Sequence, residues 1–274
     1  MIRFLLILAL GIPQTTLGGS LSLPEALRER LEMLVTQHPG EFGVRIDDIK
    51  RGETVFAGNQ STPLNPASVM KLVTTKAAID LLGVGFRWKT DVLIDGILQS
   101  KTLTGDLYLR GSGDPTLDLI RFKLLLKSIY DLGIHSIKGN VYADRSSFPP
   151  DTHDPGKFDD EPLRPYNVGP DALLVNANIF NARFIPNQET QSVELISSPS
   201  NFHIVNELKL VDRPCAKWPK TPTINNGQIV FRGSYPAACG MKQRQYNLAS
   251  PSFYFENIFL TEWEALGGTL DGQI

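Results

Sequence analysis

The chain has 274 residues, with 27 lysines and arginines against 29 aspartates and glutamates, which gives a formal net charge of −2. This balance argues against a protein that binds nucleic acid through its phosphates, because such proteins carry an excess of basic residues. Hydrophobic residues make up 42% of the chain and charged residues 20%, a composition that is typical of globular rather than disordered proteins.

The first twenty residues have the pattern of a secretory leader. Arg3 precedes the apolar run 4–12, and small residues follow at 16–19. The alternative is a membrane anchor, but a spanning helix needs about 20 apolar residues, and no later stretch of the chain provides them. We therefore expect a cleaved signal peptide over 1–19 and an exported mature protein without a transmembrane segment.

Hydrophobic periodicity and turn residues predict the remaining elements in chain order. Helices are expected over 23–37, 67–82, 117–132 and 251–266. A β-hairpin is expected over 42–57, with further strands at 88–94, 106–110 and 137–143. Residues 145–170 read as a loop, and only short, weakly patterned strands are expected from 172 to 235. Gly83 is well placed to end the second helix.

Two cysteines fit an exported protein. Cys215 and Cys239 could pair in an oxidising compartment, with a stabilisation of about 3.5 kcal/mol on the chain-entropy model. The alternative is a pair of free, buried thiols. The sequence has no Cys-x-x-Cys, and its four histidines show no metal-ligand spacing, so we predict neither a metal nor a cofactor. A Ser-His-Asp triad stays open because triads assemble in space, although no Gly-x-Ser-x-Gly segment supports one.

The clearest chemical motif is Ser68-Val69-Met70-Lys71, a Ser-x-x-Lys pattern at the start of the predicted helix 67–82. Three residues make almost one helical turn, so the Ser68 hydroxyl and the Lys71 amine should share a face. A helix N-terminus favours an oxyanion, and a desolvated lysine amine can take the proton of a serine that attacks an acyl group. The motif also occurs by chance in many helices, in which case Lys71 is simply a solvated side chain.

Four segments together resemble the D-alanyl-D-alanine carboxypeptidase/endopeptidase family of the penicillin-binding protein 4 type, the class C low-molecular-mass penicillin-binding proteins. They are similar to the family's active-serine segment, its glycine–aspartate–proline signature, its strand ending in an aspartate, and the opening of its later insertion. In this sequence these segments are Asn65–Thr75, Leu107–Leu117, Val141–Phe148 and Tyr166–Leu173. The resemblance covers essentially the whole mature chain.

The resemblance implies a periplasmic serine hydrolase that cleaves D-Ala-D-Ala bonds of peptidoglycan stem peptides, or their D-Ala–diaminopimelate cross-bridges, through an acyl-enzyme that β-lactams trap. It makes Ser68 the nucleophile and Lys71 its base, with backbone N–H groups, one of them from Ser68, holding the oxyanion. It also makes Asp144 the carboxylate that holds the ammonium end of a diaminopimelate side chain. On its own, Asp144 could equally cap a loop.

The fold that the resemblance implies is α+β and multidomain. We expect an incomplete serine β-lactamase/transpeptidase-like α/β domain, with helices on an antiparallel sheet, built from 20–88 and 246–274. An inserted domain II should cover 89–165, and an inserted β-rich domain III should cover 166–245.

Two further motifs of this enzyme class, Ser-x-Asn and Lys-Thr-Gly, do not occur in the 274 residues, and the segment 101–105 only approaches the second. The match to the family ends near 266–270, so we expect a C-terminally truncated chain with impaired activity. One alternative is a non-catalytic remnant or peptidoglycan-binding module. Another is an esterase or β-lactamase that uses Ser68 and Lys71, although the large insertion does not suit a compact β-lactamase.

Overall fold

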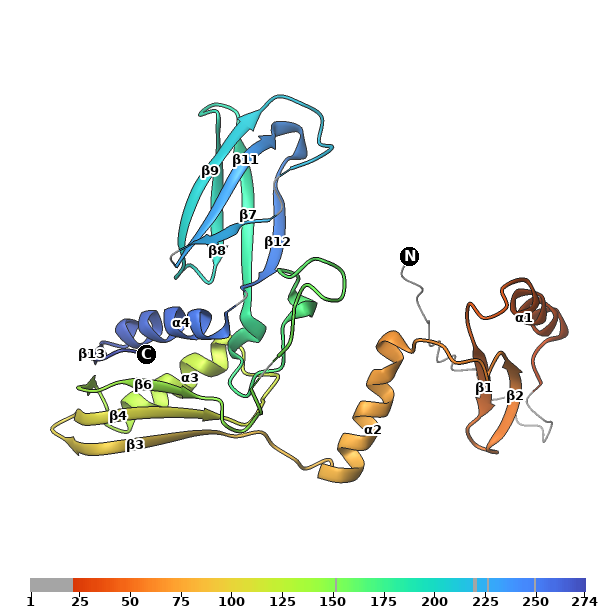
Figure 1. The fold of residues 1–274 in the computed structure, drawn as a ribbon, viewed down its shortest axis with the longest axis horizontal. Helices are drawn as coiled ribbons and strands as arrows, with labels where there is room; N and C mark the ends of the chain where they lie inside the picture. The colour runs from red at the N-terminus through yellow and green to blue at the C-terminus, as the bar shows by residue number, and fades with distance from the viewer. Residues whose placement is uncertain (1–21, 151, 219–220, 226, 249) are drawn as a thin grey trace. The chain divides into compact units, whose positions relative to one another are not determined.

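The structure is a computed structural model that describes residues 22–150, 152–218, 221–225, 227–248 and 250–274 (Figure 1). The predicted signal peptide therefore lies outside the described residues. The chain divides into two compact units, Met1–Phe86 and Arg87–Ile274. The described residues contain helices and several separate β-sheets, which confirms the predicted α+β class. Among the described residues, no helix combines the length and the hydrophobicity needed to cross a membrane.

The first unit contains a helix on a β-hairpin, followed by a second helix. Its elements are α1 (Glu25–Gln37), β1 (Val44–Asp48), β2 (Glu53–Gly58), η1 (Ala67–Val69) and α2 (Met70–Leu82). The two strands pair antiparallel, as predicted. Helix α1 approaches β2 closely at Gly58, where a Cβ atom would lie 2.5 Å from Cγ2 of Val35. A side chain at position 58 would therefore push α1 off the hairpin.

Helix α2 ends at Gly83, whose φ of 79° suits glycine and matches the predicted cap. No residue of α2 is buried, although its sequence is rich in apolar residues. Leu72, Val73 and Leu81 are 58%, 63% and 83% exposed. Among the described residues of the first unit, Phe56 is the single buried hydrophobic side chain, so this unit has almost no core of its own.

The second unit contains a mixed sheet covered on one face by two helices (Figure 1). Its strands are β3 (Thr90–Gln99), β4 (Thr102–Gly111), β5 (Ser136–Ile137), β6 (Val141–Asp144) and β13 (Thr269–Leu270). Strand β4 pairs antiparallel with β3 and parallel with both β5 and β6. Leu103, Leu107 and Leu109 of β4 are completely buried. These three residues share one face of the sheet, since successive side chains of a strand point to opposite faces.

Helices α3 (Leu119–Asp131) and α4 (Pro251–Ala265) contribute the other side of this core. The Phe122 and Phe255 rings meet edge to face with centroids 5.7 Å apart, and Trp263 is 1% exposed. Strand β13, which follows α4, pairs with β5. Residues 251–274 therefore pack against α3 and β5 of the second unit. The predicted domain boundaries, at 20–88 with 246–274, 89–165 and 166–245, stay predictions.

Residues 179–247 form two three-stranded sheets that extend from the helical side of the second unit (Figure 1). The strands are β7 (Ile179–Asn187), β8 (Ser192–Ser198), β9 (His203–Val211), β10 (Thr223–Asn225), β11 (Gln228–Pro236) and β12 (Lys242–Asn247). The short helices of the second unit are η2 (Pro165–Asn167), η3 (Val175–Asn178) and η4 (Ala237–Cys239). Most of these strands are longer than the sequence pattern predicted. Buried aromatic rings, including those of Phe184, Phe231 and Tyr235, fill the space between the sheets.

The chain enters and leaves this β7–β12 region at adjacent points. The Nδ2 of Asn178, just before β7, donates to Oδ1 of Asn247 at the end of β12, at 2.7 Å, and also to the carbonyl of Leu248. The hydroxyl of Tyr254 on α4 donates to the carbonyl of Ile179 at 2.9 Å. The two ends of the region are thus fixed to each other and to α4.

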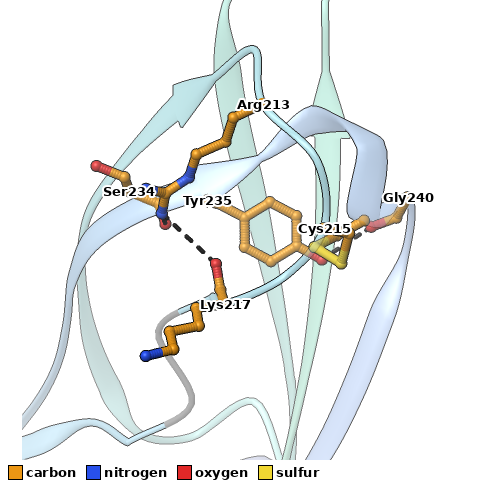
Figure 2. Close-up of a disulfide and its surroundings, with 7 residues drawn as sticks. Arg213, Cys215, Lys217, Ser234, Tyr235 and Gly240 are labelled. Atoms are coloured by element: carbon orange, nitrogen blue, oxygen red, sulfur yellow. Dashed lines mark hydrogen bonds between the residues drawn. A yellow bond between two sulfur atoms is a disulfide. The ribbon is translucent and has the colours of Figure 1, made fainter.

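At the opposite end of the β7–β12 region, a disulfide joins Cys215 to Cys239 (Figure 2). The predicted pairing is therefore present, and the alternative of free thiols is not. The Tyr235 hydroxyl donates to the carbonyl of Gly240 at 2.8 Å, and its ring packs against Trp218 with centroids 5.8 Å apart. These contacts hold the loop between β9 and β10 against η4.

Candidate active site

The Ser-x-x-Lys motif spans the junction of η1 and α2. Asn65 accepts a hydrogen bond from the backbone N–H of Ala67 on its Oδ1, at 2.9 Å, and so shapes the turn before the motif. Ala67 has a φ of 44°, a left-handed conformation that costs a residue with a Cβ about 1–3 kcal/mol. Strain of this kind is concentrated at functional sites, and here it lies one residue before Ser68.

Ser68 and Lys71 contact each other directly. The Lys71 Nζ donates to the Ser68 Oγ at 3.0 Å, which is the proximity that the three-residue spacing predicted. Ser68 lies in the N-terminal turn that leads into α2, where backbone N–H groups and the helix dipole favour negative charge. Both side chains are exposed among the described residues. The arrangement supplies a nucleophile and an adjacent amine, but not the desolvation that a lysine base requires.

Asp144 is the last residue of β6 and belongs to the second unit, whereas Ser68 and Lys71 belong to the first. Its Oδ1 accepts a hydrogen bond from the backbone N–H of Ser146 at 2.9 Å. Hydrogen bonds from Ser146 hold the pKa of the Asp144 carboxyl below its usual range, and the charge of nearby Arg110 adds to this effect. The carboxylate therefore caps its own turn and is ionised at neutral pH. Its predicted role in substrate binding stays a prediction.

The residue after Asp144 forms a contact that sequence reasoning missed. Arg145 Nε donates to both carboxylate oxygens of Asp171, at 3.0 and 2.8 Å. The two side chains are only 25% and 10% exposed, and Asp171 also accepts from the backbone N–H of Leu173 at 2.7 Å. An ion pair of this burial is far less screened than one at the surface. It fixes the end of β6, and with it the backbone of Asp144.

Three of the segments singled out in the sequence meet at this point. Ser147 donates to the carbonyl of Gly111 at 2.7 Å, and the N–H of Gly113 donates to the carbonyl of Ala172, also at 2.7 Å. A Cβ at position 111 would lie 2.0 Å from that same carbonyl oxygen, so the close approach requires glycine. In the sequence, these contacts were indicated only by charged and small residues in three separate motifs.

Comparisons with known proteins identify the family of the chain. The model of the D-Ala-D-Ala carboxypeptidase 3 (S13) family matches residues 27–274, and the chain belongs to this family. A D-alanyl-D-alanine carboxypeptidase from Actinomadura sp. (strain R39) is 31% identical over 147 residues, which cover 50% of this chain and 27% of that protein. The D-alanyl-D-alanine carboxypeptidase DacB of Haemophilus influenzae is 28% identical over 190 residues, which cover 69% and 40%.

Solved structures show the same fold. Penicillin-binding protein 4 (dacB) from Haemophilus influenzae matches with a TM-score of 0.72 at 24% identity, over 88% of this chain and 55% of that one. The same protein complexed with a novel β-lactam matches with a TM-score of 0.64 at 20% identity, over 89% and 53%. The chain thus spans about half the length of the solved structures and less of the curated relatives it matches.

Proposed function

We propose that this chain is a periplasmic serine-type D-Ala-D-Ala carboxypeptidase/endopeptidase that acts on peptidoglycan stem peptides, with Ser68 as nucleophile and Lys71 as base. The observation that carries the proposal is the 3.0 Å contact between Lys71 Nζ and Ser68 Oγ in a chain of the S13 family. The leader pattern at residues 1–19 and the Cys215–Cys239 disulfide support an oxidising, exported location.

In the proposed reaction, the Lys71 amine takes the Ser68 proton while Oγ attacks the carbonyl carbon of the penultimate D-Ala. The oxyanion that forms lies at the N-terminal turn of α2. Its collapse breaks the peptide bond, and the leaving amine of the terminal D-Ala takes the proton from Lys71. Water then hydrolyses the acyl-enzyme and restores Ser68. A β-lactam would acylate the same oxygen as its ring opens.

We further propose that the 274-residue chain by itself turns over slowly. The Ser-x-Asn and Lys-Thr-Gly motifs do not occur in it, and Ser68 and Lys71 are exposed among the described residues. Loss of one oxyanion donor alone typically lowers a rate by about 10²–10³, and here several groups are missing together. The alternative raised by the sequence, a non-catalytic module that binds peptidoglycan, stays a second candidate.

Intact-mass analysis after incubation with benzylpenicillin separates the two candidates. If the chain is a serine carboxypeptidase, the parent chain should carry a penicilloyl adduct and Ser68→Ala should carry none. Circular dichroism checks that both proteins are folded. Val69→Ala, at a position of the motif that carries no reacting group, is a matched control that should still acylate. If the folded parent chain carries no adduct, Ser68 is not a working nucleophile here and the carboxypeptidase proposal fails.

We also propose that Asp144 binds the ammonium group at the end of the diaminopimelate side chain. Its carboxylate is ionised and held in place by Ser146 and the neighbouring Arg145–Asp171 pair. In the acylation assay, Asp144→Asn should slow reaction with a peptide that ends in a free ammonium and leave reaction with benzylpenicillin unchanged. Asp95→Asn, an exposed carboxylate on β3, is the control. Equal slowing with both acyl donors would show that Asp144 has only a structural role.

A further inference from the structure

Charge is distributed unevenly between the β7–β12 region and the rest of the chain. Residues 179–247 contain eight lysines and arginines against four aspartates and glutamates. The remaining residues contain 19 against 25. The region that extends from the second unit is therefore basic, while the chain as a whole is slightly acidic. A separation of this kind affects what a surface attracts rather than how the chain folds.

Several of these cations gather at the end of the region that is closed by the disulfide. Lys209 is paired in register with Ser234, and the Arg213 Nη2 lies 3.4 Å from the carbonyl of Ser234 and 3.5 Å from that of Lys217. Lys242 begins β12, three residues after Cys239. We call Lys209, Arg213, Lys217 and Lys242 the cationic tip.

The tip carries an uncompensated charge. Elsewhere in the β7–β12 region, Arg232 pairs with Glu207 and Arg244 pairs with Glu161. Within the part of the chain that the structure describes, no carboxylate lies within ion-pair distance of the four tip cations. Asp212 is the one acidic residue in the loop itself, and it is exposed.

The tip cations are also held in place, because the disulfide, the Tyr235–Gly240 hydrogen bond and the packing of Trp218 fix this loop. In Figure 2 the Arg213 and Lys217 side chains extend to the side of the Tyr235 ring that is opposite the disulfide.

One of these cations has an exposed apolar neighbour in the chain. Met241 directly precedes Lys242, follows the turn at Gly240, and is 64% exposed. A hydrophilic polyanion would leave this side chain without a partner. An interface of anionic lipid head groups would accept both parts of the tip, because basic side chains meet the head groups while an exposed apolar side chain enters the boundary of the acyl chains. We propose that the cationic tip docks the protein on a membrane surface rich in anionic lipid.

Co-sedimentation of the 274-residue chain with vesicles tests the proposal. Binding should be strong to vesicles with 30% phosphatidylglycerol, negligible to pure phosphatidylcholine vesicles, and weaker when NaCl is raised from 50 to 300 mM, since salt screens exposed charges. Lysines near an anionic surface contribute about fivefold each in affinity, so Lys209→Gln/Lys217→Gln/Lys242→Gln should lose on the order of 100-fold. Arg213 is kept because its guanidinium contacts the backbone.

The matched control is Lys101→Gln/Lys138→Gln/Lys157→Gln, which removes three exposed lysines of the second unit that lie outside the β7–β12 region. This variant should bind within about threefold of the parent. The segment 1–21 is common to all three proteins, so any contribution that it makes cancels in the comparison. Equal loss in both variants, or no loss in either, would overturn the proposal. Lysine-dependent binding to a soluble anionic polysaccharide without binding to vesicles would overturn it too.

Discussion

Removal of the Cys215–Cys239 disulfide should produce a large and calculable loss of stability. The bond joins residues separated by 24 positions and thereby restricts the unfolded chain. On the chain-entropy model a closed loop of about 25 residues stabilises the folded state by about 3.5 kcal/mol. The substitution Cys215→Ser/Cys239→Ser removes this restriction. The Tyr235–Gly240 hydrogen bond and the Trp218 packing should keep the folded structure of the loop.

Urea unfolding followed by tryptophan fluorescence measures the effect, because Trp218 lies inside the closed loop and packs on Phe184 with centroids 5.1 Å apart. With a urea dependence of about 2 kcal/mol per molar, the unfolding midpoint should fall by roughly 1.5–2 M. Addition of a thiol reductant should shift the parent by the same amount and leave the variant unchanged. A midpoint shift below roughly 0.5 M, with the urea dependence unaltered, would refute the entropic reasoning.

Three further predictions concern the second unit, all read out by urea unfolding. Asp118→Ala removes the side chain that accepts from the Arg121 N–H at 2.8 Å and should cost about 1 kcal/mol, while Asp118→Asn should cost less; equal costs would contradict a capping role. Trp263→Ala, at a side chain that is 1% exposed, should cost about 3–5 kcal/mol, and a cost below roughly 1 kcal/mol would show that α4 is not part of the core. Burial raises the pKa of Tyr254 to about 12, so the unfolded chain loses this proton first, and stability should fall by roughly 2–3 kcal/mol between pH 10 and 12. Tyr254→Phe should remove a contribution of this size, while the fall due to Tyr246, whose pKa burial also raises, should remain; an unchanged pH dependence would argue against the burial effect.

The helices could be predicted from the sequence because their apolar residues repeat at helical spacing. The four expected helices match α1, η1 with α2, α3 and α4 within about two residues at each end. Periodicity shows which face of a helix is apolar, but not which element covers that face. For this reason residues 251–266 were predicted as a helix, yet its packing against α3 and its link to β5 through β13 were not.

The strands of the β7–β12 region were harder to predict. In β7 the buried Phe180, Ala182 and Phe184 alternate correctly, but Asn181 and Pro186 are poor strand formers and weaken the pattern. Strand β9 pairs in parallel with β11, 25 residues further along the chain. A parallel pairing leaves no hairpin signal in the sequence, so these strands were expected to be short.

One part of the candidate site could be predicted from local sequence, and another part could not. The contact between Ser68 and Lys71 follows from local spacing, and it is present in the structure. The Arg145–Asp171 pair joins residues 26 positions apart and depends on how the loop after β6 folds back. No local rule could have matched these two residues. Their charge and their place in two separate motifs were the only indications.

The adjacency of Asn178 and Asn247 has a consequence for how the protein folds. Ser136 and Thr269, which hydrogen-bond through their side chains, are 133 positions apart, and much of that separation is the β7–β12 region. A chain with many such distant contacts has a high contact order and folds slowly. If the region forms first, its ends come together and the remaining loop shortens to roughly half its length, which lowers the entropic cost of closing the sheet around β5 and β13. The β7–β12 region would then fold early and bring α4 back to the strands it covers.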